Sequence, residues 1–148
     1  MRDQTIMLVE DNPDDEMLTL RALKKNNILN EVFVAHDGVE ALEYLFPDSG
    51  QAAAGLPGLI LLDLNLPKVN GLEVLRRIRA DQRTRLVPIV VLTSSKEQED
   101  ILDSYHGGAN AYVRKPVNFA DFSAAVRTLG MFWLLLNEPV PEVIPPPD

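Results

Sequence analysis

The chain has 148 residues, a formal net charge of −8 and no cysteine. The length predicts one domain that buries its own core, and the lack of cysteine excludes disulfides, thiolate metal sites and cysteine nucleophiles. An acidic chain argues against direct nucleic-acid binding, which needs a basic face. With no signal-peptide pattern and no apolar run long enough to cross a bilayer, we expect a cytoplasmic protein without a membrane partner.

One segment of the chain approaches a basic patch. Its arginines lie between positions 76 and 85, and they are Arg76, Arg77, Arg79, Arg83 and Arg85. Acidic residues are interspersed nearby, so we interpret this segment as a solvated helix face and loop rather than a nucleic-acid-binding site.

Short apolar runs alternate with amphipathic stretches along the chain. Continuous apolar runs bounded by turn residues are typical of strands buried on both faces of a parallel sheet. Apolar residues at spacings of three and four are typical of helices. In chain order, we predict strands over residues 5–9, 31–35, 59–62, 87–92 and 109–113, and helices over 14–26, 39–46, 96–106 and 118–136, with a further helix opening at Asn70.

This alternation predicts an α/β fold, a doubly wound five-stranded parallel sheet with helices on both faces. In such sheets, ligands bind at the carboxyl ends of the strands. The residues at those ends are Glu10, Asp11, Asp63, Thr93 and Lys115. We therefore expect these five side chains to meet in one pocket.

Three of these residues, Glu10, Asp11 and Asp63, bring carboxylates close together in the predicted pocket. Like charges at short range need a cation, and Mg²⁺ prefers oxygen ligands. A carboxylate can act as a nucleophile toward a phosphoryl group, while Lys115 and Thr93 can hold phosphoryl oxygens through charge and a hydrogen bond. The pattern indicates phosphoryl transfer onto a carboxylate with the help of a metal ion.

Four motifs containing these residues follow one another along the chain. The acidic pair lies in residues 8–12, Asp63 in residues 61–71, Thr93 in residues 91–94 and Lys115 in residues 112–116. Together they resemble the receiver domain of two-component response regulators over residues 4–136. The resemblance implies a flavodoxin-like sheet with strand order 2-1-3-4-5, in a receiver domain of residues 1–136 followed by a Pro-rich tail of residues 137–148.

The resemblance implies a role for each residue near the metal. Asp63 would accept a phosphoryl group from a partner sensor histidine kinase and would also contribute to the metal site. Asp11 would bind Mg²⁺ directly and Glu10 through water, while the backbone carbonyl of Asn65 would complete the protein ligands. Such a chain is a phosphorylated signalling protein rather than an enzyme.

The resemblance also implies a conformational switch. Thr93 and Lys115 would bind the phosphoryl group, and the inward movement of Thr93 would let Tyr112 swing inward. The Lys115–Pro116 peptide bond would be cis, as is usual in such receivers. The first acidic position holds Glu10, where aspartate is also common.

The last predicted helix carries more apolar surface than one side of a sheet can cover. Residues 131–136 are apolar in every direction, and such a helix must be covered on more than one side. We predict a homodimer through this region, with the alternative that the tail folds back over it. The interface residues would be Phe122, Leu129, Phe132, Trp133 and Leu136.

Three alternatives share parts of this pattern. A phosphohydrolase with an aspartyl-phosphate would need a second aspartate where Asn65 stands, and a flavodoxin-like electron carrier would need a Gly- and hydroxyl-rich loop where Glu10 and Asp11 stand. A degenerate receiver would act only as a docking module. The loop at 47–58 and the apolar C-terminal extension further resemble the small regulators paired with bacterial phytochrome histidine kinases.

Overall fold

The computed structural model describes residues 5–47, 55–94, 98–115 and 118–130, the side chains of Leu129 and Gly130 excepted. Five parallel strands form one sheet in the order β2-β1-β3-β4-β5, which confirms the predicted fold. The elements in chain order are β1 Ile6–Val9, α1 Pro13–Lys25, β2 Val32–Ala35, α2 Gly38–Leu45, β3 Leu59–Leu62, α3 Gly71–Ala80, β4 Ile89–Thr93, α4 Gln98–His106, β5 Ala111–Arg114 and α5 Phe119–Gly130.

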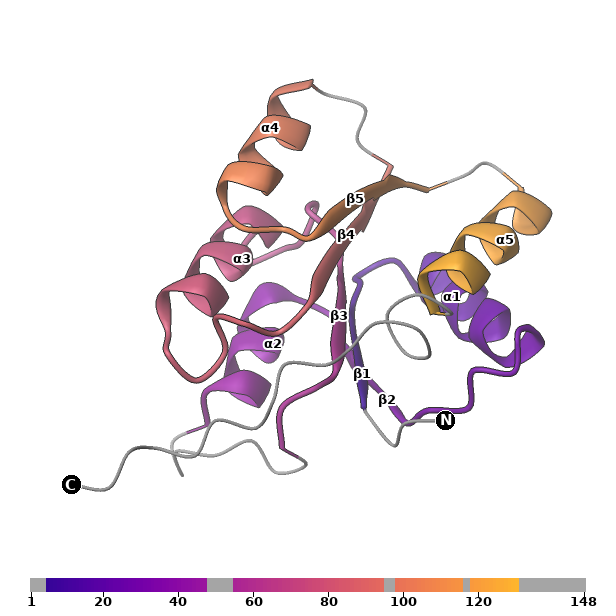
Figure 1. Ribbon diagram of the computed structural model, residues 1–148, viewed down its shortest axis with the longest axis horizontal. Coiled ribbons are helices and arrows are strands. Elements are labelled where there is room, and N and C mark those ends of the chain that lie inside the picture. The colour runs from indigo at the N-terminus through magenta and orange to yellow at the C-terminus, as the bar shows by residue number, and fades with distance from the viewer. Residues whose placement is uncertain (1–4, 48–54, 95–97, 116–117, 131–148) are drawn as a thin grey trace.

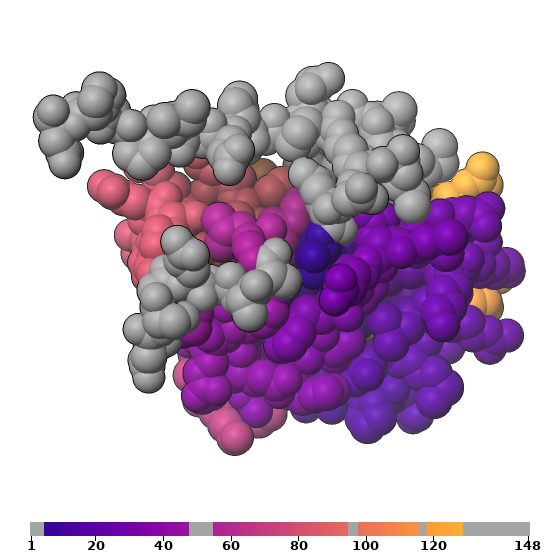
Figure 2. Space-filling view, turned by 90° about the horizontal axis from the view of Figure 1, so that it is seen from below, coloured from indigo at the N-terminus to yellow at the C-terminus, as the bar shows by residue number. Residues whose placement is uncertain are grey.

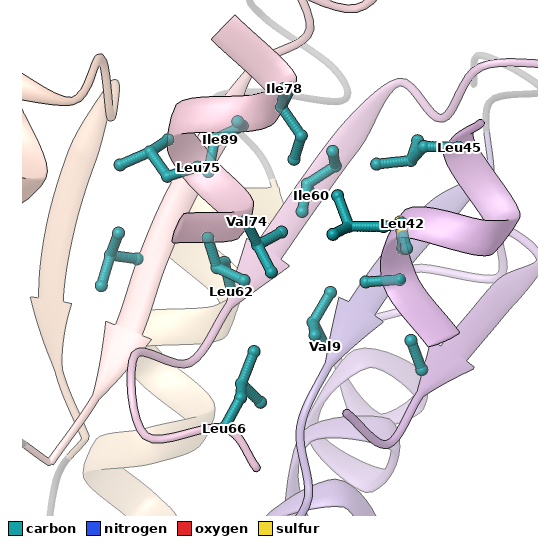
Figure 3. Close-up of a cluster of buried hydrophobic side chains, with 14 of the residues drawn as sticks. Val9, Leu42, Leu45, Ile60, Leu62, Leu66, Val74, Leu75, Ile78 and Ile89 are labelled. Carbon is teal, nitrogen blue, oxygen red and sulfur yellow. The ribbon is translucent and has the colours of Figure 1, made fainter. Parts of the chain in front are cut away.

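The sheet lies between two layers of helices (Figure 1). Helices α2, α3 and α4 lie on one side, and α1 and α5 lie on the other. Every residue of β1, β3 and β4 is buried, whereas β2 and β5 form the two edges. The larger core cluster joins the sheet to α2 and α3 through side chains such as Val9, Leu42, Leu62 and Leu75 (Figure 3).

Helices α1, α2 and α3 each begin at a side chain that accepts backbone hydrogen bonds. Asn12 accepts from two N–H groups of α1, Asp37 from one of α2, and Asn70 from one of α3. Such caps satisfy donors that have no partner within the helix. Pro13 occupies the first position of α1, where a missing N–H costs nothing. The helix starts expected near Pro13 and at Asn70 are therefore confirmed.

Two strands, β4 and β5, begin two residues later than the sequence indicated. Val87 donates its N–H to Thr84 in a turn, and Pro88 has no N–H to offer a strand ladder, so β4 starts at Ile89. Asn110 directs its side-chain oxygen to the N–H of Ile89 rather than extending β5. Helix α4 ends at the predicted Gly107-Gly108 stop, where Gly108 has a φ of +103° that other residues rarely adopt.

Helix α5 packs along α1 on the second face of the sheet. The Asn26 side chain at the end of α1 donates to both the carbonyl and the hydroxyl of Ser123, each at 3.1 Å. The Phe119 ring lies beneath the cations of Arg21 and Lys25, at 4.6 and 5.3 Å. Figure 2 shows the yellow atoms of α5 adjoining the violet atoms of this N-terminal region.

The predicted interface residues divide between described and undescribed parts of the chain. Phe122 is 3% exposed and belongs to the core cluster beneath α1 and α5, so its side chain serves the core of its own chain. The side chain of Leu129, together with Phe132, Trp133 and Leu136, lies outside the described residues, as does the Pro-rich tail. Within the described residues, no helix is long and apolar enough to cross a membrane.

The arginine segment is only partly the solvated face that the sequence suggested. Arg76 and Arg77 pair with Glu73, and Arg83 pairs with Asp81. Arg79 instead lies partly buried. Its guanidinium donates to the carbonyls of Arg85, Val87 and Gly108 and to Asn110 Oδ1, at 2.7–2.9 Å. It therefore ties α3 to the turns that precede β4 and β5.

Replacing Arg79 with methionine should lower the free energy of unfolding by about 1–2 kcal/mol, because partly buried carbonyl groups lose their donors. The aliphatic length of the side chain is kept, so the loss reports the hydrogen bonds. Urea denaturation followed by circular dichroism would measure it. Arg76→Met is the matched control, and its exposed ion pair should be worth less than about 0.5 kcal/mol. Equal effects of the two changes would contradict the structural role of Arg79.

Candidate functional site

Backbone pairing continues past the strands and fixes three polar residues at the carboxyl edge of the sheet. The N–H of Glu10 donates to a carbonyl of β2, that of Asp63 to a carbonyl of β1, and that of Lys115 to a carbonyl of β4, at 2.8–3.0 Å. Thr93 is the last residue of β4. The parallel register therefore brings all four residues to one edge, as the sequence predicted.

Asp63 is buried, with 6% of its surface exposed, and both of its carboxylate oxygens accept hydrogen bonds. Oδ1 accepts from Thr93 Oγ1 at 2.8 Å and from the N–H of Asn65 at 3.1 Å. Oδ2 accepts from Lys115 Nζ at 2.9 Å. The carboxylate is thus held from two sides in a fixed orientation, and Thr93 and Lys115 are its direct neighbours.

The loop after Asp63 turns back tightly over it. The N–H of Gly71 donates to the carbonyl of Leu64 at 3.0 Å. A Cβ atom on Gly71 would lie 2.3 Å from the backbone oxygen of Asp63, which is too close for any side chain. The Asn70-Gly71 pair therefore both caps α3 and lets the loop close against the residue that bears the central carboxylate.

Lys115 is the centre of the charge network. Its side chain is 7% exposed, and its ammonium group donates to Glu10 and Asp63 and to Asp15 Oδ2, the last at 2.9 Å. An ammonium group has three protons to donate, so all three are used. Glu10, which is 2% exposed, also accepts from the N–H of Asn12 at 3.3 Å.

The two buried carboxylates have opposite pKa shifts. Burial raises the pKa of Glu10 to about 7, since desolvation and the nearby charge of Asp63 outweigh the pairing with Lys115. Burial alone would also raise the pKa of Asp63, but the ion pair and hydrogen bond with Lys115 more than offset it, and the pKa is lowered. At Lys115, desolvation alone would lower the pKa, but the hydrogen bonds and charges of Glu10 and Asp63 outweigh it, so the pKa of the ammonium group is raised. Asp63 is therefore ionised at neutral pH, whereas Glu10 gains and loses its proton around pH 7.

The carboxylates fit a divalent cation. Glu10, Asp11 and Asp63 each offer one oxygen, and these oxygens lie within 4.8 Å of one another. Asp11 is exposed and faces no cation among the described ion pairs, and Glu10 is only partly neutralised by Lys115. Oxygen donors of this number and charge are those that Mg²⁺ and Mn²⁺ take in proteins.

Three contacts around this edge lie outside the sequence predictions. Asp15 lies in the acidic first turn of α1, yet its carboxylate reaches Lys115 across the fold. The Nε2 atom of His36 lies 2.7 Å from Glu16, and its Nδ1 atom lies 3.7 Å from Glu40. The contacts of Asp15 with Lys115 and of His36 with Glu16 have no sequence signal, because each joins residues far apart in the chain, whereas His36 and Glu40 are an i,i+4 pair.

The remaining predicted residues are placed as follows. Tyr112 lies on β5, partly buried against the cluster beneath α3. Asn65 follows Asp63 in the loop and is exposed, with its N–H on the Asp63 carboxylate. The predicted cis bond involves Pro116, which lies outside the described residues.

Comparison with known proteins gives one consistent result. The family model for the response regulator receiver domain matches residues 6–127. Response regulator Rcp1 of Synechocystis is 37% identical over 131 residues, which cover 88% of this chain and 89% of Rcp1.

Two solved structures extend this likeness. The phosphorylated cyanobacterial phytochrome response regulator RcpA has a TM-score of 0.87 at 39% identity, with 93% of this chain and 99% of RcpA covered. The bacteriophytochrome response regulator AtBRR is 51% identical with a TM-score of 0.72, and 93% of this chain and 100% of AtBRR are covered. With the family model matching most of its length, this chain belongs to the response regulator receiver domain family.

Proposed function

We propose that this protein accepts a phosphoryl group on Asp63, with Mg²⁺ held by Asp11, Asp63, the backbone carbonyl of Asn65 and, through water, Glu10. The observation that supports this most is the Asp63 carboxylate itself. It is buried and ionised, it contacts Lys115 and Thr93, and it lies beside two further carboxylates. The comparisons agree with this proposal, since Rcp1 has a crystal structure with Mn²⁺ and RcpA one in the phosphorylated form.

The phosphoryl donor is a phosphohistidine of a sensor kinase. An oxygen of Asp63 forms a bond to phosphorus while the P–N bond breaks. The electron pair of the broken P–N bond stays with the imidazole nitrogen, and the imidazole takes up a proton. Lys115 donates to one phosphoryl oxygen and Thr93 to another, which neutralises and orients the transferred group. A bound Mg²⁺ supplies positive charge that offsets the repulsion between carboxylate and phosphate. The chain is a signalling protein that promotes only its own phosphorylation and dephosphorylation.

The same contacts provide a switch. Thr93 donates its hydroxyl to Asp63 in this structure, and a phosphoryl group on Asp63 offers it a new acceptor. Movement of Thr93 along β4 would change the space beside Tyr112 on the neighbouring strand. The signal then leaves through this altered surface by protein contacts in the cytoplasm. A bacteriophytochrome kinase is the proposed partner because RcpA and AtBRR are phytochrome response regulators. The output is proposed to involve a homodimer through the last helix region.

Incubation with Mg²⁺ and acetyl phosphate, followed by intact mass, tests the proposal directly. One added phosphoryl group is expected on the wild-type chain, and none on Asp63→Asn or in the presence of a chelator. Size-exclusion chromatography with light scattering, before and after phosphorylation, would show whether the oligomer changes. If neither a phosphoryl group nor beryllofluoride binds, the protein is a docking module that works without phosphorylation.

A further inference from the structure

We propose that Asp15 is a positioning residue that holds Lys115 and weakens the attraction of the site for anionic phosphodonors. This inference rests on the proposed function of Asp63 and goes beyond the residues that the motifs identify. The juxtaposition that carries it is the contact between Asp15 Oδ2 on α1 and Lys115 Nζ after β5, at 2.9 Å.

The contact joins two residues that are far apart in the sequence but close in the fold. Asp15 lies in the first turn of α1, which the Asn12 cap anchors next to Glu10. Lys115 is 7% exposed, whereas the Asp15 side chain is 32% exposed. Asp15 therefore lies on the solvent-facing side of the Lys115 ammonium group, whereas Glu10 and Asp63 lie on its buried side.

The three protons of Lys115 have three acceptors before any phosphoryl group arrives. Glu10 and Asp63 are both part of the proposed metal site, and Asp15 is the acceptor outside it. A phosphoryl oxygen that binds Lys115 must therefore replace one of these acceptors or share a proton with it. Asp15 competes for that proton and keeps the ammonium group directed toward α1.

The negative charge of Asp15 also weakens the binding of an anionic phosphodonor. The site already holds the carboxylates of Glu10, Asp11 and Asp63 around a single ammonium group. A further carboxylate in contact with that ammonium lowers the net positive charge that a phosphate dianion meets on approach. Removing one negative charge within a few ångströms of a dianion changes its affinity by about three- to tenfold in a partly screened setting.

Phosphorylation kinetics of Asp15→Asn separate this role from a structural one. The variant keeps the shape and loses the charge. With Mg²⁺ and acetyl phosphate, which is a dianion at neutral pH, we expect the donor KM to fall about three- to tenfold with kcat little changed. The gain should be smaller with phosphoramidate, which carries less negative charge, and it should shrink as salt rises.

Two further variants complete the test. Asp15→Glu keeps the charge and should behave as wild type. Asp14→Asn removes the same charge from the neighbouring exposed position, which contacts no lysine in the described ion pairs, and it should leave the donor KM nearly unchanged. In metal-free protein, the Lys115 ammonium protons should exchange with water faster in Asp15→Asn than in Asp14→Asn, as measured by NMR.

The outcomes are distinct. An unchanged KM in Asp15→Asn, a fall in kcat instead, or an equal effect of Asp14→Asn would overturn the proposal while leaving Asp63 as the acceptor. An Asp15→Glu variant that behaves like Asp15→Asn would also overturn it, because the charge would then not be the cause. If wild-type protein accepts no phosphoryl group at all, the proposed function fails and this inference falls with it.

Discussion

Lys115→Met should reduce phosphorylation of Asp63 by at least about a hundredfold and should also destabilise the metal-free protein. Lys115 contacts Glu10 and Asp63, and both carboxylates are almost fully buried. Removing one partner of a buried ion pair leaves uncompensated charge and typically costs about 3–5 kcal/mol. Acetyl phosphate labelling and urea denaturation at pH 8 with a chelator would measure the two losses.

The loss of stability in Lys115→Met should depend on conditions in two ways. It should be smaller at pH 5, because the unpaired carboxylates can then take up protons. Mg²⁺ should restore part of it at pH 8, because the cation supplies the missing positive charge. Lys24→Met, at an exposed position of α1, is the control and should change stability by less than about 0.5 kcal/mol. Equal stability of Lys115→Met and wild type at pH 8 would show that the buried pair does not hold the carboxylates in place.

The metal-free protein should lose stability as the pH rises from about 4.5 to about 7, because of Glu10. Burial raises the pKa of this carboxyl from 4.5 to about 7 in the folded chain. The folded state therefore binds more protons than the unfolded state over this interval, so the free energy of unfolding falls as the proton is lost. A shift of this size corresponds to about 3 kcal/mol, present in full below pH 4.5 and gone above pH 7.

Denaturation of wild type and Glu10→Gln across this pH range, with a chelator throughout, would isolate the contribution. The amide cannot ionise, so Glu10→Gln should flatten the profile and be the more stable of the two proteins above pH 7, while it binds Mg²⁺ less tightly. Glu43→Gln, at an exposed position of α2, should follow the wild-type profile. Parallel profiles for wild type and Glu10→Gln would mean that the buried carboxyl is not the source of the pH dependence.

Much of the fold and site could be predicted because both depend on strand ends. Each apolar run is followed by a polar residue, and the parallel register places Glu10, Asp63, Thr93 and Lys115 at one edge. The contact of Asp15 with Lys115 could not be predicted, because an acidic residue in the first turn of a helix already has a sufficient local reason to be there. Whether Asp15 also contacts Lys115 depends on how α1 packs against the chain that follows β5.

For Arg79 and Phe122, too, the sequence could not predict which parts of the fold they contact. Arg79 lies among exposed arginines in the sequence, and only the turns before β4 and β5 give it buried acceptors. The sequence pattern predicts that Phe122, on the last helix, lies in an interface with a second copy of the chain. In the structure, its side chain packs from α5 into the core among side chains of β1 and α1. Periodicity identifies an apolar face without identifying what covers it.

The packing of α5 on α1 has a consequence for synthesis of the chain. Ile6, Leu8 and Leu23 are translated long before Phe122 and Val126, which share their core cluster. A nascent chain must therefore expose one face of its central strands until nearly the whole domain has been translated. The face toward α2 and α3 is nearly complete earlier, because every buried residue of its cluster except Ala109 lies at or before Val91 in the chain. Until α5 has been made, this one unfinished face exposes apolar side chains that can aggregate or bind a chaperone.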